Sequence, residues 1–263
     1  MSVLLYEKHN QIAYITLNRP EVLNSFNDEL NTAIGEALVD YREDPSLLVA
    51  ILSGTGRAFS TGADLKELVA KGGSAGGRQL NTPLMKSDLP EWPGNMKEVW
   101  KPIIAAIDGY AVAGGFHLAL ECDIRLATVN SRLGDIESRI SAWGGRHFKR
   151  MVKMMPFGEA MHMLLTGTHM SAEEAYRIGL VHKVVENRDD LMREAESIAE
   201  EIKQCAPLAV QAVRRLAYTS FMKSGRELDE LNQVLKKGVS ETEDAQEGPR
   251  AFAEKRKPIW KMH

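Results

Sequence analysis

Short, almost wholly apolar runs recur along the first half of the chain, and a polar residue or a glycine ends each of them. Runs of this length are typical of strands that are covered on both faces. A short alternating segment at 6–8 precedes the first run, and the turn-like "HNQ" between them predicts two paired strands. The runs that predict strands span residues 12–17, 47–54 and 102–109.

Amphipathic stretches separate these runs. Residues 27–44 repeat apolar side chains at helical spacing, and Ser25 with Asp28 has the spacing of a capping box. Further helices are predicted to begin near Asp64 and to cover 114–123. Buried strands that alternate with helices predict an α/β fold in which ββα units repeat around a parallel core. The apolar stripe on the first helix consists of Leu30, Ile34, Leu38 and Tyr41.

The C-terminal part of the chain is mostly helical in pattern. Ser171 and Glu174 predict a capping box, and Gly179 is placed to end the helix that follows. We therefore divide the chain into an α/β core over 1–200 and a helical region over 201–263 that serves oligomerisation and closure of the site. Later amphipathic segments span 188–207, 208–222 and 228–240.

Composition excludes several classes of function. The chain has 33 Lys and Arg against 36 Asp and Glu, and this net charge of -3 argues against a nucleic-acid partner. The N-terminal segment has no long apolar stretch, so we expect neither a signal peptide nor a membrane span. Cys122 and Cys205 belong to no C-x-x-C motif and predict a reducing, cytoplasmic location. The seven histidines show no metal-ligand spacing, so no metal is expected.

Two loops of one design carry the chemical signal. Each predicted strand before them leads to a pair of small residues, Gly62-Ala63 or Gly114-Gly115, and then to a helix. Free N–H groups at a helix start carry partial positive charge, and small side chains let a ligand approach them. If the strands are neighbours, the N–H groups of Ala63 and Gly114 form an oxyanion hole for a reacting carbonyl. Turn chemistry explains either pair alone equally well. A phosphate loop is disfavoured, since Phe59 occupies the third glycine position after "GTG".

Five segments of the chain carry a family likeness: "LNRPEVLNSFNDEL", "RAFSTGADLKEL", "KPIIAAIDGYAVAGGFHLALECDIRLA", "SAEEAYRIGLVHKVV" and "AFAEKRKPIWK". In this order, over nearly the whole chain, they resemble the enoyl-CoA hydratase/isomerase (crotonase) superfamily. The resemblance implies a crotonase-like spiral of ββα units with a helical C-terminal trimerisation region. It also implies acyl-CoA substrates, no cofactor beyond the coenzyme A of the substrate, self-association to a trimer or hexamer, and an oxyanion hole from Ala63 and Gly114.

The resemblance also locates two catalytic positions. Hydratases of this superfamily carry two glutamates that position a water and move its proton. The matching positions here are His117 and Glu137, so the first acid is replaced and the second is retained. His117 could be a base, a hydrogen-bond donor to a polar acyl group, or a packed helix residue with no role. Glu137 could equally be a solvated carboxylate. The segment 124–137 reads as two extended pieces, and Asp135 then shares a face with Glu137.

Further residues are predicted to bind substrate. The resemblance implies that Lys66 and Lys255 contact the nucleotide end of coenzyme A, although a solvated charged tail remains an alternative for Lys255. Trp143 is a candidate wall of the acyl pocket, because "SRISAW" makes the link after Glu137 unusually short for the superfamily. The complete predicted substrate-binding set is Ala63, Asp64, Leu65, Lys66, Gly114, Asp135, Trp143 and Lys255.

We predict that the chain is an enoyl-CoA hydratase, which adds water to a 2-enoyl-CoA. A Δ3,Δ2-enoyl-CoA isomerase is the first alternative, because one glutamate suffices to move a proton between two carbons. An acyl-CoA decarboxylase or hydrolase would need the same oxyanion hole. A catalytically inactive crotonase-fold binding protein is the non-enzymatic alternative. The acyl group is not specified, since it depends on the segments 72–95 and 138–150.

Overall fold

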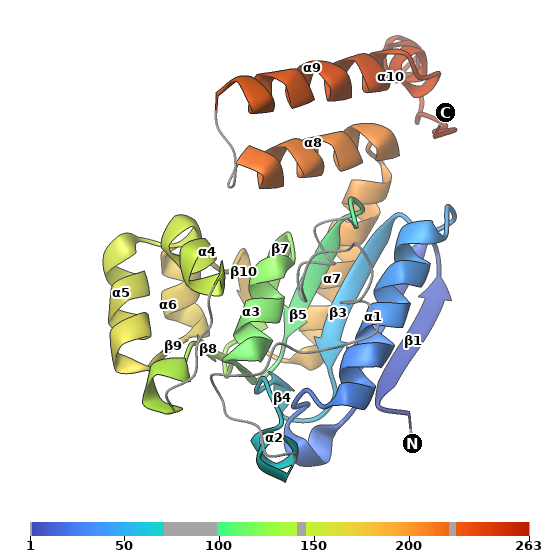
Figure 1. Cartoon of the computed structure of the whole chain (residues 1–263). Coiled ribbons are helices and arrows are strands. Elements are labelled where there is room, and N and C mark those ends of the chain that lie inside the picture. The colour runs from blue at the N-terminus through green and yellow to red at the C-terminus, as the bar shows by residue number, and fades with distance from the viewer. Residues whose placement is uncertain (1, 71–98, 141–145, 221–224, 263) are drawn as a thin grey trace.

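The computed structural model describes residues 2–70, 99–140, 146–220 and 225–262. Within these ranges helices flank a central sheet, and three helices form a separate layer at the top of Figure 1. This arrangement confirms the predicted α/β class. No helix in these ranges is both long and apolar enough to cross a membrane.

The larger sheet has six strands in the order β1-β2-β3-β5-β7-β10. β1 and β2 form an antiparallel pair, and all other neighbours in this sheet are parallel. Every residue of β3 is buried, as predicted for a strand covered on both faces. The strands are β1 (Leu4–His9), β2 (Ile12–Leu17), β3 (Val49–Gly54), β5 (Ile103–Ile107), β7 (Ile124–Thr128) and β10 (Lys183–Val185).

A smaller sheet continues from the ends of these strands. Its order is β4-β6-β8-β9, with β4, β6 and β8 parallel to one another. β4, β6 and β8 follow β3, β5 and β7 directly along the chain, so a pair of consecutive strands repeats three times. This repeat is the core of the ββα units that the sequence predicts. The strands are β4 (Ala58–Ser60), β6 (Tyr110–Val112), β8 (Arg132–Gly134) and β9 (His169–Ser171).

Helices cover both faces of the larger sheet (Figure 1). α1 and α3 contribute to one apolar core cluster, and the predicted stripe of α1 is fully buried within it. α7 packs its apolar side chains on the opposite face, against β3, β5 and β7. The α-helices are α1 (Asp28–Glu43), α2 (Leu65–Ala70), α3 (Gly114–Glu121), α4 (Arg146–Met154), α5 (Phe157–Thr166), α6 (Ala172–Arg177), α7 (Arg188–Lys203), α8 (Pro207–Ser220), α9 (Arg226–Ser240) and α10 (Asp244–Ala253).

Two local predictions need correction and one is confirmed. The N-cap of α1 is Asn27, whose side chain accepts the N–H of Leu30, so Ser25 does not begin that helix. The backbone at Glu137 is not extended, because this residue starts a 3-10 helix that ends at Ile140. The capping box of Ser171 before α6 is confirmed in both of its hydrogen bonds.

The C-terminal helices α8, α9 and α10 form the separate layer of Figure 1. Since α7 ends at Lys203, this layer begins with α8. Arg214 fastens α8 to the core, because its buried guanidinium lies 2.7 Å from the carboxylate of Asp123 and also donates to the carbonyl of Val99. The role of this layer in oligomerisation stays a prediction.

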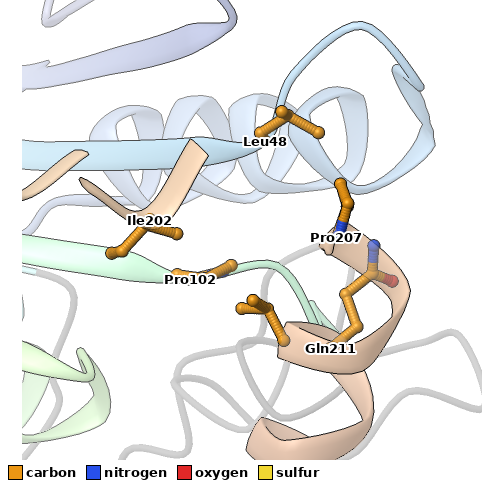
Figure 2. Close-up of a pocket in the computed structure, with 6 residues that line it drawn as sticks. Leu48, Pro102, Ile202, Pro207 and Gln211 are labelled. Atoms are coloured by element: carbon orange, nitrogen blue, oxygen red, sulfur yellow. The ribbon is translucent and has the colours of Figure 1, made fainter. Parts of the chain in front are cut away.

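Figure 2 shows a small apolar crevice at the start of α8. Its volume is only about 10 Å³, room for about one water. Leu48 and Pro102 stand just before β3 and β5, so the crevice lies at the N-terminal ends of these parallel strands. The two glycine loops follow the other ends of the same strands, and the crevice is therefore no part of the candidate site. Its lining consists of Leu48, Pro102, Ile202, Pro207, Val210 and Gln211.

Candidate active site

The two glycine loops lie against each other, as the oxyanion-hole hypothesis requires. β3 and β5 are parallel neighbours, and so are β4 and β6. A Cβ added to Gly62 would stand 2.6 Å from the backbone nitrogen of Gly114, and one added to Gly115 would stand 2.1 Å from the carbonyl oxygen of Ser60. Gly62 also has a φ of +83°, a backbone conformation that costs free energy for any residue with a Cβ. The loops therefore meet backbone to backbone.

The two predicted donors lie on these loops. Gly114 is the first residue of α3, where an N–H has no partner within the helix. Hydrogen bonds between Phe26 and the neighbours Gly62 and Asp64 hold the backbone on both sides of Ala63. Within the described ranges, neither the Ala63 N–H nor the Gly114 N–H has a hydrogen-bond acceptor. Their oxyanion role stays a prediction.

Strand pairing explains why His117 and Asp135 meet. β6 leads into α3, which carries His117, while β8 leads directly to Asp135. The two strands are parallel neighbours, so the segments that follow them leave the same edge of the sheet. Ala113, with a φ of +49°, makes the sharp turn into α3, and its N–H donates to the carbonyl oxygen of Gly134. The turn is thereby fixed to the end of β8.

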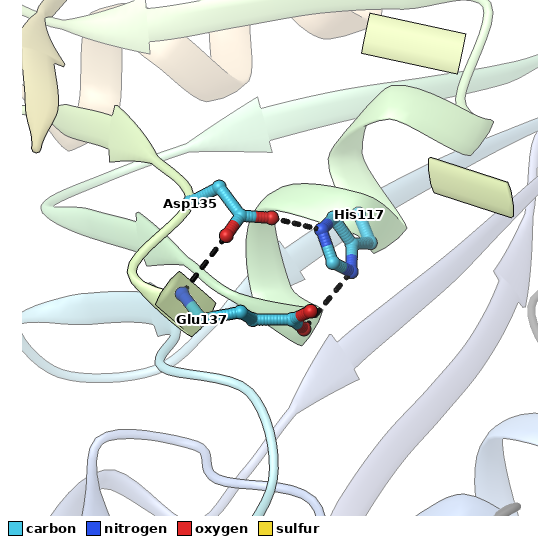
Figure 3. Close-up of side chains that lie close together, drawn as sticks. All are labelled: His117, Asp135 and Glu137. Carbon is cyan, nitrogen blue, oxygen red and sulfur yellow. Dashed lines mark hydrogen bonds and ion pairs between the residues drawn. The ribbon is translucent and has the colours of Figure 1, made fainter. Parts of the chain in front are cut away.

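The side chains of His117, Asp135 and Glu137 lie close together in this place, as one cluster (Figure 3). His117 Nε2 lies 2.6 Å from Oδ2 of Asp135, and both residues are almost fully buried. On the other side of the ring, Nδ1 lies 3.7 Å from Oε1 of Glu137. The N–H of Glu137 donates to Oδ1 of Asp135 at 2.9 Å. The structure thus brings together the two predicted catalytic side chains and the candidate Asp135.

The surroundings of Glu137 disfavour the charged form of its carboxyl. Burial raises the pKa of the Glu137 carboxyl above its ordinary value, the charge of Asp135 adds to this effect, and His117 opposes it. Within the described ranges, Oε2 of Glu137 is buried and has no hydrogen-bond partner. A proton on this carboxyl removes the cost of an uncompensated buried charge.

His147 also belongs to the cluster, although the sequence did not predict it. Its ring, on α4, stacks on the ring of His117 with centroids 4.2 Å apart and an angle of 10° between planes. Glu121, on the same helix as His117, lies 3.9 Å from Nδ1 of His147 and 3.1 Å from Arg150. Only the four-residue spacing of His117 and Glu121, which places both on one face of α3, hints at this extension. Nothing in the sequence pattern identifies His147.

The same three side chains of the cluster are of types that can bind a metal ion. One possible ligand atom from each of His117, Asp135 and Glu137 lies within 4.8 Å of the others. The 2.6 Å between Nε2 and Asp135 is a hydrogen-bond distance, however, and two ligands of one Zn²⁺ ion at about 2.0–2.2 Å each stand farther apart. The geometry favours a hydrogen-bonded proton site over a metal centre.

The predicted residues around the first loop differ in their surroundings. Asp64 is bound within the protein, since its carboxylate lies 3.2 Å from Arg19 and accepts the N–H of Glu67. Burial alone would raise the pKa of Asp64, but these partners outweigh it and hold the pKa below its ordinary value. Leu65 and Lys66, on α2, are exposed to solvent.

The last two predicted residues lie away from the cluster or outside the described ranges. Lys255 is exposed and lies two residues after α10, the helix that stands at the opposite end of the molecule from α2 in Figure 1. The structure therefore does not bring Lys255 to Lys66 within one chain. Trp143, the candidate wall of the acyl pocket, lies outside the described residues.

Comparisons with known proteins agree with the predicted family. The model of the enoyl-CoA hydratase/isomerase family matches residues 7–263. The chain is 39% identical to (E)-benzylidenesuccinyl-CoA hydratase of Thauera aromatica, over 97% of each protein. It is 36% identical to carnitinyl-CoA dehydratase of Salmonella typhi, over 97% of this chain and 96% of that protein. Among solved structures, enoyl-CoA hydratase from Mycobacterium tuberculosis H37Rv matches with a TM-score of 0.88 and 32% identity over the full length of both chains. The chain belongs to the enoyl-CoA hydratase/isomerase family, as a mixed α/β enzyme of the crotonase fold.

Proposed function

We propose that this protein adds water to the carbon–carbon double bond of a 2-enoyl-CoA. Family membership supports a hydratase that acts on CoA thioesters, and the two relatives above are named for adding or removing water. The observation that carries the proposal is the pair of Nδ1 of the buried His117 and Oε1 of the partly buried Glu137, 3.7 Å apart. This separation is too long for a direct hydrogen bond and suits two groups that hold one water between them.

The loops supply the other half of the chemistry. Water addition places negative charge on the thioester oxygen as the double bond accepts the nucleophile. The N–H groups of Ala63 and Gly114 are the proposed donors to that oxygen, and a fixed donor at such a site lowers the barrier by stabilising developing charge. His117 and Glu137 then handle the protons of the water. Asp64, which is already paired with Arg19, serves as the cap of α2 in this proposal.

A panel of thioesters tests the reaction type. We expect purified protein to convert a 2-enoyl-CoA into a product heavier by one water, as detected by mass spectrometry. Migration of the double bond in a 3-enoyl-CoA without a mass change would instead identify an isomerase, and loss of carbon dioxide or release of free coenzyme A a decarboxylase or hydrolase. Absence of any turnover across the panel would contradict the proposal and favour an inactive binding protein.

We also propose that the chain works as a trimer or a hexamer. The C-terminal layer exposes large apolar side chains, including Val213, Val234 and Phe252, the last with 87% of its surface accessible. Apolar exposure on this scale is typical of surfaces that bind another protein chain. In such an assembly Lys255, which lies far from α2 of its own chain, can approach the coenzyme A bound by a neighbouring subunit.

Two lysine variants test this arrangement together. Lys66→Ala is expected to weaken coenzyme A binding about 10-fold in any assembly state, since it removes one contact to a charged group. Lys255→Ala is expected to do so only where sedimentation shows the oligomer, and rising salt should shrink both effects. Binding is measured by calorimetry, with Lys236→Ala on α9 as the control. Unchanged affinity in both variants, or a monomer at all concentrations, would contradict the arrangement.

The two cysteines bear on where the protein resides. Cys122 is buried in the core, Cys205 is exposed, and both are free thiols. An exposed free thiol suits a reducing environment, so we propose that the protein resides in the cytoplasm.

A further inference from the structure

The bond between His117 and Asp135 fixes which nitrogen of the ring is available for chemistry. A carboxylate can only accept a hydrogen bond, so Nε2 of His117 carries the hydrogen that Asp135 accepts at 2.6 Å. In the neutral ring the other nitrogen, Nδ1, then holds the lone pair. This nitrogen faces Oε1 of Glu137, as Figure 3 shows. The geometry therefore prepares Nδ1 to accept a proton at the place where the water is proposed to bind.

We propose that Asp135 is a positioning residue that makes His117 the general base of water addition and leaves Glu137 as the general acid. This inference rests on the proposed hydratase function and divides the proton transfers between the two side chains. It also changes the predicted role of Asp135 from binding substrate to orienting the base. Asp135 is 1% exposed, and its oxygens already contact His117 and the N–H of Glu137.

The protons balance over one turnover. The water oxygen forms a bond to the β-carbon, and the proton of the water passes to Nδ1 of His117. The π electrons move toward the thioester carbonyl, whose oxygen takes up negative charge beside Ala63 and Gly114. Protonated Glu137 then gives its proton to the α-carbon, which leaves a Glu137 carboxylate and a His117 imidazolium. One proton that returns from Nδ1 to Glu137 restores the starting state, so no external acid or base is consumed.

The groups around His117 suit an imidazolium intermediate. The Asp135 carboxylate lies against Nε2, and Glu137 becomes negative as its proton leaves. Glu121 and Arg150 stand one step farther out and compensate each other at 3.1 Å. Among the described residues, the ring of His147 stacks on that of His117, and two imidazolium rings 4.2 Å apart would repel each other.

Asp135→Asn tests the assignment with little change in shape. The new carboxamide can keep its oxygen toward the N–H of Glu137 and present its NH₂ to Nε2 of His117. Nε2 must then accept, so the hydrogen moves to Nδ1 and the base is blocked. We expect kcat to fall about 10²-fold, within the range of a lost general base. KM should change little, because Asp135 is buried and both of its carboxylate oxygens already contact His117 and the N–H of Glu137.

The pH profile separates orientation from mere support of the fold. The active pair of His117 and Glu137 carries one proton, so the rate falls when a second proton binds at low pH and when the single proton leaves at high pH. Loss of the Asp135 charge makes a protonated His117 less stable. The acidic and the basic limb of the pH–rate profile, where the rate falls, should therefore both move to lower pH. Asp108→Asn is the matched control, because Asp108 is likewise partnered, by Thr128 and Arg188, and lies outside the cluster. It should leave the rate and both limbs unchanged.

The tautomer can also be observed without any substrate. NMR of the imidazole nitrogens is expected to show the Nε2–H form of His117 in the native protein and the Nδ1–H form in Asp135→Asn. A rate loss with unmoved limbs, or an unchanged tautomer in a folded variant, would overturn the role of Asp135. Failure of the native protein to hydrate any thioester would overturn the hydratase proposal and the catalytic role with it, while the tautomer measurement would still report on the dyad.

Discussion

His117→Ala and Glu137→Gln are each expected to lower kcat for water addition about 10³-fold, within the range for removal of a general base or acid. The double variant should be scarcely slower than either single variant, because the two side chains act on the same water and share the proton that returns from His117 to Glu137. Nδ1 of His117 and Oε1 of Glu137 lie 3.7 Å apart, and the proposed water contacts both of them. The measurement is a cycle of kcat values for the native protein, both single variants and the double variant.

A control histidine variant and the result expected of an isomerase complete this cycle. His162→Ala removes an exposed histidine of α5 and should leave kcat unchanged. If His117→Ala keeps most of the turnover while Glu137→Gln abolishes it, Glu137 works alone and the isomerase interpretation gains support. Independent losses that add in the double variant would contradict a shared water.

The elements of the core follow from local pattern. Apolar runs predicted β2, β3 and β5, and the side chains Leu30, Ile34, Leu38 and Tyr41 are buried as the helical stripe requires. These predictions hold because burial on one or two faces imposes a fixed period on the sequence. The cap of α1 was missed by two residues, since Ser25 and Asn27 are both good capping residues and only tertiary contacts choose between them.

The chemistry of His117 depends on contacts that no local pattern contains. Asp135 is 18 positions away and reaches the ring only because β6 pairs with β8. The prediction that Asp135 and Glu137 share one face assumed an extended backbone, whereas a 3-10 helix begins at Glu137. The turn still lets both side chains meet His117, from its two nitrogens. The family resemblance predicted two catalytic positions, but it could not predict that the histidine at the first of them is hydrogen-bonded to a carboxylate.

Gly62→Ala is expected to lower kcat about 10²–10³-fold, comparable to the loss of one oxyanion donor. The added methyl would stand 2.6 Å from the backbone nitrogen of Gly114, which no Cβ tolerates, so the two loops must separate. The N–H groups of Ala63 and Gly114 would then no longer converge on one oxygen. Gly114→Pro would remove one of the two N–H donors directly. It would also disturb the turn, because a proline restricts the backbone of the residue before it and Ala113 has a φ of +49°. Gly62→Ala is therefore the more specific test.

Gly179→Ala separates this loop contact from the cost of the backbone conformation. Gly179 has a φ of +76°, close to the +83° of Gly62, and a Cβ there meets nothing within 4 Å. Both variants should therefore lose about 1–2 kcal/mol of stability from the left-handed conformation. Thermal unfolding should show a larger loss in Gly62→Ala, because its methyl also forces the two loops apart. Only Gly62→Ala should also lose the rate, since only its methyl separates the donors. If folded Gly62→Ala hydrates its thioester as fast as Gly179→Ala does, the convergence of the two N–H groups is not what stabilises the oxyanion.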